Sequence, residues 1–172
     1  VEGGIKGPWG WLFKLVGAKA TVDYFRAQAE ANWIARHQPD VWAATDKFLL
    51  LSGFLTHRLC GRFVDSVGCC VGYLPFDFKR LKWAAPADWK WQALAVRPEQ
   101  LPSLHKPGET LGHISAEANR HTGIPEGLPL IAAGADKACE VVGSGVVDAG
   151  TVCLSYGTTA TITSTRSRYL EI

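Results

Sequence analysis

Residues Leu128–Thr163 read LPLIAAGADKACEVVGSGVVDAGTVCLSYGTTATIT, and this stretch decides the fold prediction for the 172-residue chain. It opens with a short apolar run, Leu130–Ala133, whose length is typical of a buried strand. Asp136 follows where the run ends, and the small side chains of Lys137–Val142 are compatible with a helix. The first half of the stretch therefore predicts a strand, an acidic residue and a helix in that order.

The second half of the stretch predicts a hairpin. The apolar run Thr151–Ser155 leads to Gly157-Thr158-Thr159, and an alternating segment, Ala160–Thr163, leads away from it. An acid at a strand end and a Gly-Thr-Thr turn together suit phosphoryl transfer. The acid can take a hydroxyl proton, while the N–H and hydroxyl groups of the turn can hold phosphate oxygens.

Each of these features also has a purely structural interpretation. Asp136 before a helix can be an N-cap, because its carboxylate can accept free N–H groups of the first turn. Gly157-Thr158-Thr159 can be a plain hairpin connection, since glycine tolerates positive φ and threonine favours strands. The local pattern alone leaves both pairs of alternatives open.

The order of the motifs resembles the FGGY family of carbohydrate kinases. GADKACEVVGSGVVDAG followed by LSYGTTATI has that family's glycine-rich strand end, Asp, small-residue helix and Gly-Thr-Thr hairpin. The resemblance extends upstream through KFLLLSGFLTHRLCGRFVDS (47–66) and GYLPFDFKRLKW (72–83) and covers roughly Tyr24 to Ile162.

The resemblance implies an α/β fold of the actin-like ATPase (ribonuclease-H-like) type, in which sugar and ATP meet between two domains. It assigns residues 1–146 to the later part of the first, sugar-binding domain. It assigns residues 147–172 to the opening hairpin of the second, nucleotide-binding domain. The family's Asp-x-Gly-Thr motif and its adenosine-binding region are not found in the sequence, so we expect the chain to be an internal piece of a longer protein.

The same resemblance implies roles for individual residues. Asp136 corresponds to the catalytic base, and Gly157, Thr158 and Thr159 correspond to a phosphate-binding turn for ATP. Lys137 stands where relatives often have an amide that contacts substrate, and it can either meet an anionic sugar or form a salt bridge. The implied reaction is ATP- and Mg²⁺-dependent phosphorylation of a sugar or polyol hydroxyl. A non-catalytic kinase-like sugar-binding or regulatory protein, or the remnant of a disrupted kinase gene, is the alternative.

One loop departs from the family pattern. Asp65, Asp77 and Trp83 match it, but Val64 replaces the usual Thr, and Gly68-Cys69-Cys70 replaces an Asn-Ala-Ser-like group. The resemblance therefore assigns no role to this loop.

Composition narrows the class of partner and the compartment. A net charge of +2 without a basic stripe gives no electrostatic case for nucleic acid or an anionic membrane. The five cysteines are odd in number, lack C-x-x-C spacing and lie mostly in apolar company, which favours reduced thiols in a cytoplasmic protein without a metal site. A homo-oligomer is compatible with the sequence.

Local signals predict further elements. Thr21 is placed to cap one helix that runs to about Gln38, and Gly61 is placed to end a later helix. Ser115 and Gly123 bracket another helix as its N-cap and its C-terminal glycine. Three tryptophans, Trp83, Trp89 and Trp91, either stack on a sugar or pack around a short helix.

Overall fold

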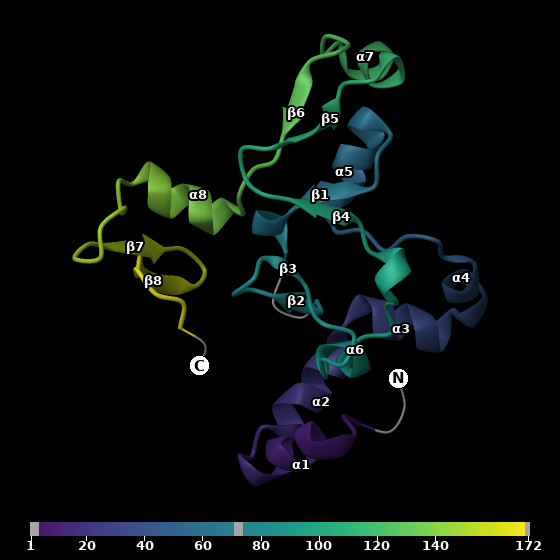
Figure 1. The fold of residues 1–172 in the computed structure, drawn as a ribbon, viewed down its shortest axis with the longest axis vertical. Helices are drawn as coiled ribbons and strands as arrows, with labels where there is room; N and C mark the ends of the chain where they lie inside the picture. The colour runs from purple at the N-terminus through teal and green to yellow at the C-terminus, as the bar shows by residue number, and fades with distance from the viewer. Residues whose placement is uncertain (1–3, 71–73, 171–172) are drawn as a thin grey trace.

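The computed structural model describes residues 4–70 and 74–170, so Gly72 and Tyr73 of the upstream motif lie outside the described residues. Helices dominate the first third of the chain, and short strands alternate with helices afterwards (Figure 1). The α-helices of the described residues are α1 (Gly7–Leu15), α2 (Lys19–Gln28), α3 (Glu30–His37), α4 (Pro39–Ala44), α5 (Leu51–Cys60), α6 (Lys90–Ala93), α7 (Ala116–Thr122) and α8 (Asp136–Gly143). Two 3₁₀ turns are η1 (Val67–Cys69) and η2 (Pro98–Gln100). None of the helices in the described ranges has both the length and the apolarity needed to cross a membrane.

The strands pair two by two. They are β1 (Val64–Ser66), β2 (Phe76–Asp77), β3 (Lys82–Trp83), β4 (Ser103–His105), β5 (Thr110–His113), β6 (Pro129–Ile131), β7 (Val152–Tyr156) and β8 (Ala160–Ser164). β1 and β4 pair in parallel, whereas β2–β3, β5–β6 and β7–β8 pair antiparallel. The mixture of helices with parallel and antiparallel strands agrees with the predicted α/β class.

The predicted helix from Thr21 to Gln38 is wrong, because two helices occupy this stretch. Thr21 lies inside α2, and Ala29 separates α2 from α3 with an extended backbone (φ −65°, ψ 123°). Ala29 and Ala31 are both buried in the main core, whereas no residue of α2 is buried. Tertiary packing of the two alanines therefore overrides the helical periodicity of the sequence.

The predicted helix ends at Gly61, Ser115 and Gly123 are confirmed. Gly61 ends α5 and Gly123 ends α7, and both adopt left-handed backbone angles that favour glycine. The Ser115 hydroxyl accepts a hydrogen bond from the Ala118 N–H at 3.1 Å and so caps the start of α7.

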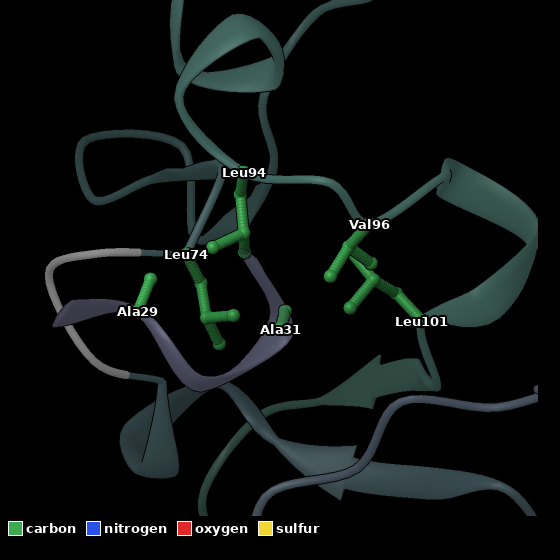
Figure 2. Close-up of a cluster of buried hydrophobic side chains, with 6 residues drawn as sticks. All are labelled: Ala29, Ala31, Leu74, Leu94, Val96 and Leu101. Atoms are coloured by element: carbon green, nitrogen blue, oxygen red, sulfur yellow. The ribbon is translucent and has the colours of Figure 1, made fainter. Parts of the chain in front are cut away.

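The main core brings residues from distant parts of the chain together (Figure 2). Its buried members are Ala29, Ala31, Leu74, Leu94, Val96 and Leu101. Trp83 and Trp91 pack against this cluster, and their indole N–H groups donate to backbone carbonyls of Pro102 and Ala85. Trp89 packs edge-on against Phe13 at 4.9 Å between ring centroids. The three tryptophans therefore pack against other parts of the chain, which is the structural one of the two roles that the sequence left open for them.

A smaller core positions the segment that carries Asp136. Val64 of β1, Leu111 of β5 and Ala132 after β6 are buried together, and Leu130 packs against them. This cluster holds the end of β6 close to the end of β1. Side chains and loops that follow these two strands can therefore meet.

Candidate functional site

Asp136 is the first residue of α8 and lies on the surface. The N-cap is Ala135 (φ −64°, ψ 155°), whose side chain makes no capping hydrogen bond, so the interpretation of Asp136 as the N-cap is wrong by one position. Oδ1 of Asp136 still accepts a hydrogen bond from the backbone N–H of Lys137 at 2.7 Å. The helix N-terminus also favours a negative charge at this position. The carboxylate is thus held at the start of α8 and is exposed to solvent.

Lys137 forms the salt bridge that was one of its two predicted roles. Its Nζ donates to Glu140 Oε2 at 2.7 Å and to Ser155 Oγ at 2.9 Å. The hydrogen bond to the Glu140 carboxylate raises the pKa of the Lys137 ammonium group, and the same bond lowers the pKa of Glu140. Lys137 therefore ties the first turn of α8 to strand β7.

Strand β7 runs antiparallel to α8, beside it (Figure 1). Near the start of α8, Lys137 contacts Ser155, and beyond its end Ser144 lies 4.0 Å from the sulfur of Cys153. Advancing along β7 thus leads back toward the first turn of α8. The Gly157–Thr159 turn comes two residues after Ser155, so it lies at the same end of α8 as Asp136.

The Gly157–Thr159 turn is a three-residue connection that is open to solvent. Tyr156 pairs with Ala160 across it, and all three turn residues are exposed. A Cβ atom built on Gly157 would meet no atom within 4 Å, and the φ of Gly157 lies outside the left-handed region. Glycine is therefore not required here by backbone strain, while its missing side chain leaves space for a ligand to approach the backbone.

The loop with the unusual sequence Gly68-Cys69-Cys70 packs against the segment before Asp136. Ala135 donates its N–H to the Gly68 carbonyl oxygen at 3.0 Å, and the Ser66 hydroxyl donates to the carbonyl oxygen of Ala133. Sequence reasoning missed Ser66 and Gly68. The only sequence signal was the departure at Gly68, where the resemblance assigned no role.

The thiols of this loop are half-buried. Burial, together with the Asp65 carboxylate, raises the pKa of Cys69, and the same causes with Cys69 itself raise the pKa of Cys70 to about 12. All five cysteines are free. Among the described residues, there is no group of three or more His, Cys, Asp or Glu side chains that could hold a metal ion.

A cleft of the described chain lies elsewhere. It has a volume of about 490 Å³ and lies among α1, α2 and α3, where Lys14, Lys19, Arg26 and Arg36 contribute to its lining. None of the predicted site residues lines it. Asp136 and the Gly157–Thr159 turn instead form an open surface at one end of α8.

Comparison with known proteins places the chain in a family. Residues 18–143 match the family model for the N-terminal domain of the FGGY family of carbohydrate kinases. The chain is 36% identical over 120 residues to the uncharacterised sugar kinase YgcE of Escherichia coli, covering 70% of this chain and 23% of that protein. It is 32% identical over 126 residues to the xylulose kinase of Escherichia coli, covering 73% of this chain and 25% of that protein.

Solved structures agree on the fold. The crystal structure of xylulose kinase from Rhodospirillum rubrum superposes with a TM-score of 0.68 at 23% identity, covering 82% of this chain and 33% of that one. The chain spans about a quarter of the length of the curated relatives that it matches. Its α/β fold is part of the actin-like ATPase fold of these kinases. The match over residues 18–143 and the identity to curated sugar kinases show that the chain belongs to the FGGY family of carbohydrate kinases.

Proposed function

We propose that this chain is part of an ATP-dependent kinase that phosphorylates a hydroxyl group of a sugar or polyol. The observation that carries the proposal is the position of Asp136 and of the open Gly157–Thr159 turn at the same end of α8. Phosphoryl transfer needs a group that accepts the proton of the attacking hydroxyl and groups that hold phosphate oxygens. The two features supply these groups at the same end of one helix.

Each residue has a defined part in the proposed reaction. The exposed carboxylate of Asp136 accepts the proton of the sugar hydroxyl as the hydroxyl oxygen attacks the γ-phosphorus of ATP, and the bond to the bridging oxygen breaks so that ADP leaves. The Gly157 N–H and the hydroxyl groups of Thr158 and Thr159 hold phosphate oxygens. When bound, ATP would supply the phosphoryl group, and Mg²⁺ would neutralise the charge of the phosphates.

The Lys137–Glu140–Ser155 contact links the two elements of this site. Lys137 joins the helix that begins with Asp136 to the strand that leads to the turn. Because the Nζ atom of Lys137 is engaged with Glu140 and Ser155, we assign it to joining these two elements. Contact with an anionic substrate is therefore not part of the proposed role.

The domain assignment and the substrate are part of the proposal. Residues 1–146 form the later part of the sugar-binding domain, and residues 147–172 begin the nucleotide-binding domain. The names of the relatives make xylulose the first substrate to test, followed by other ketoses, aldoses, sugar acids and polyols. The five free thiols are in keeping with a cytoplasmic enzyme.

The decisive experiment replaces Asp136 by Asn and by Ala in the full-length protein. Asn keeps one oxygen that can accept the Lys137 N–H, but it cannot take up the hydroxyl proton. We expect Asp136→Asn to lower kcat by about 10²–10⁴-fold while the unfolding midpoint and ATP binding stay near those of the wild type. Steady-state kinetics, ATP titration and thermal unfolding of the same preparations provide the three measurements.

Two outcomes would contradict the proposal. If Asp136→Asn turns over sugar at the wild-type rate and only Asp136→Ala loses stability, Asp136 only stabilises the start of α8 and is not the base. If the wild-type protein binds a sugar by calorimetry but never transfers phosphate to it, the alternative of a non-catalytic sugar-binding protein holds.

A further inference from the structure

The segment that carries Asp136 has no side chain able to fix its own conformation. Residues 132–135 read Ala-Ala-Gly-Ala, and the N-cap of α8 is Ala135, which makes no side-chain capping bond. Such a segment offers only backbone N–H and C=O groups for hydrogen bonding. Its position must therefore be set by partners from another part of the chain.

Ala132 pairs through its backbone with Gly108 and Glu109, whereas the partners of Ala133 and Ala135, the residues nearer to Asp136, come from the end of β1. The buried hydroxyl of Ser66, whose residue is 1% exposed, donates to the Ala133 carbonyl oxygen and accepts the Gly68 N–H at 3.1 Å. The Gly68 carbonyl oxygen in turn accepts the N–H of Ala135 at 3.0 Å. These bonds reach both sides of Gly134 and stop at the residue directly before Asp136.

Close contact between the two loops depends on the absence of a side chain at Gly68. A Cβ atom built there would lie 2.9 Å from the Cα of Gly134 and 3.1 Å from the Ala133 carbonyl oxygen. Both are backbone atoms, so the added methyl group cannot be accommodated by rotating a side chain. The φ of Gly68 lies outside the left-handed region. Space, and not backbone conformation, is therefore what requires glycine at this position.

We infer that Ser66 and Gly68 are positioning residues that set the place of Asp136 relative to the bound sugar. The inference rests on the proposed role of Asp136 as the general base. A shift of the 133–135 segment moves the first residue of α8 with it, because Ala135 and Asp136 are covalently joined. A displacement of about 1 Å at a reacting group can lower the rate about 10²-fold. Ser66 and Gly68 thus govern kcat without touching the substrate.

The test uses Gly68→Ala and Ser66→Ala in the full-length protein, each alone and combined with Asp136→Asn. We expect Gly68→Ala to lower kcat by about 10²-fold and Ser66→Ala by about tenfold, with smaller changes in the KM for sugar and for ATP. In the Asp136→Asn background, neither change should lower kcat much further, because both act through the Asp136 carboxylate. Ser66→Ala only removes atoms, so it remains testable if Gly68→Ala does not fold.

Matched controls separate positioning from general destabilisation. Gly143→Ala adds the same methyl group at the other end of α8, where a Cβ atom meets nothing within 4 Å, and kcat should not change. Ser115→Ala removes another hydroxyl that accepts a backbone N–H, at the N-cap of α7, and it should lower stability while leaving kcat intact. Each control thus differs from its test variant in where it acts and not in the kind of change.

The outcomes distinguish this inference from the proposed function. Wild-type kcat in both Gly68→Ala and Ser66→Ala, with Asp136→Asn inactive, would overturn the inference and leave the proposed function standing. An equal loss of kcat in the wild-type and Asp136→Asn backgrounds would overturn it as well, because the effect would then not run through Asp136. A wild-type protein that phosphorylates no sugar or polyol would overturn the proposed function and the inference together.

Discussion

At the scale of single residues, two carboxylates show how opposite environments act on one chemical group. Asp65 is 5% exposed, and its burial raises the pKa of its carboxyl group. Hydrogen bonds from the Ser52 hydroxyl and the Ser66 N–H offset this burial only in part. Asp77 lies nearer the surface, and hydrogen bonds led by the Arg80 N–H lower its pKa. Burial dominates at the first site and hydrogen bonding at the second.

We therefore expect Asp65→Asn to become more stabilising, relative to the wild type, as the pH rises. The raised pKa means that the folded state binds this proton more tightly than the unfolded chain does. The stabilisation that the protonated Asp65 contributes is therefore fully present below the ordinary Asp pKa. It is lost as the pH rises through the raised pKa of the folded state. An uncharged Asn has no such loss. Unfolding midpoints of both proteins between about pH 3 and pH 7 test this expectation, because this interval begins below the ordinary pKa of an aspartate.

Asp77→Asn provides the contrast, because the pKa of Asp77 is shifted in the opposite direction. The lowered pKa of Asp77 contributes stability above the ordinary Asp value, and this contribution is lost as the pH falls through the lowered one. The Asn variant should thus be slightly less stable at neutral pH and equal to the wild type in acid. If the two variants changed with pH in the same direction, the assignment for Asp65 would be wrong.

At the scale of elements, α7 shows how a short helix is delimited by its ends. It has only seven residues and buries only Ala118. The Ser115 hydroxyl accepts the Ala118 N–H at its start, and Gly123 in a left-handed conformation ends it. A helix this short gains little from propagation, so its caps contribute a large share of its stability.

Replacing Ser115 by Ala should therefore cost about 1 kcal/mol of stability. In a domain of this size, that loss corresponds to a decrease in melting temperature of about 2–4 °C. Ser115→Asn is the matched control, since asparagine caps about as well as serine and should retain the wild-type melting temperature. A melting temperature for Ser115→Ala equal to that of the wild type would show that α7 is held by packing alone.

At the scale of the whole molecule, the β7–β8 hairpin turns its apolar face outward. Val152, Leu154, Tyr156 and Ile162 are exposed, the last two at 82% and 76%. The alternate residues, among them Ser155 and Cys153, are half-buried and contact α8. An uncovered apolar face of this kind promotes association.

We expect the isolated 172-residue chain to self-associate through this face and to lack kinase activity. Sedimentation velocity should show a mass that increases with protein concentration. Leu154→Lys combined with Ile162→Lys should reduce this dependence, because the charges oppose burial of the face. Val41→Lys, at an exposed apolar residue of α4, should leave association unchanged. A monomeric wild-type chain that phosphorylates sugar would contradict the expectation.

Features that depend on neighbours in the sequence were predictable. The ends of α5 and α7 at Gly61, Ser115 and Gly123 follow from backbone freedom and from a hydroxyl within reach of its own helix. The order of strand, Asp136, helix and hairpin around the Gly157–Thr159 turn follows from short-range patterns of apolar and small residues. The family follows from the same order, which the comparisons confirm.

Features that depend on contacts across the chain were decided only by the tertiary structure. The helical pattern breaks at Ala29 because Ala29 and Ala31 pack into a core with Leu74 and Leu94, far away in sequence. Lys137 joins Ser155 across 18 residues, and Gly68 reaches Ala135 across 67. Periodicity and capping describe one segment at a time, whereas these contacts depend on where the packing of the core places two segments relative to each other. The sequence by itself thus singled out Asp136, the residue proposed as the base, and the tertiary structure decided what holds that residue in place.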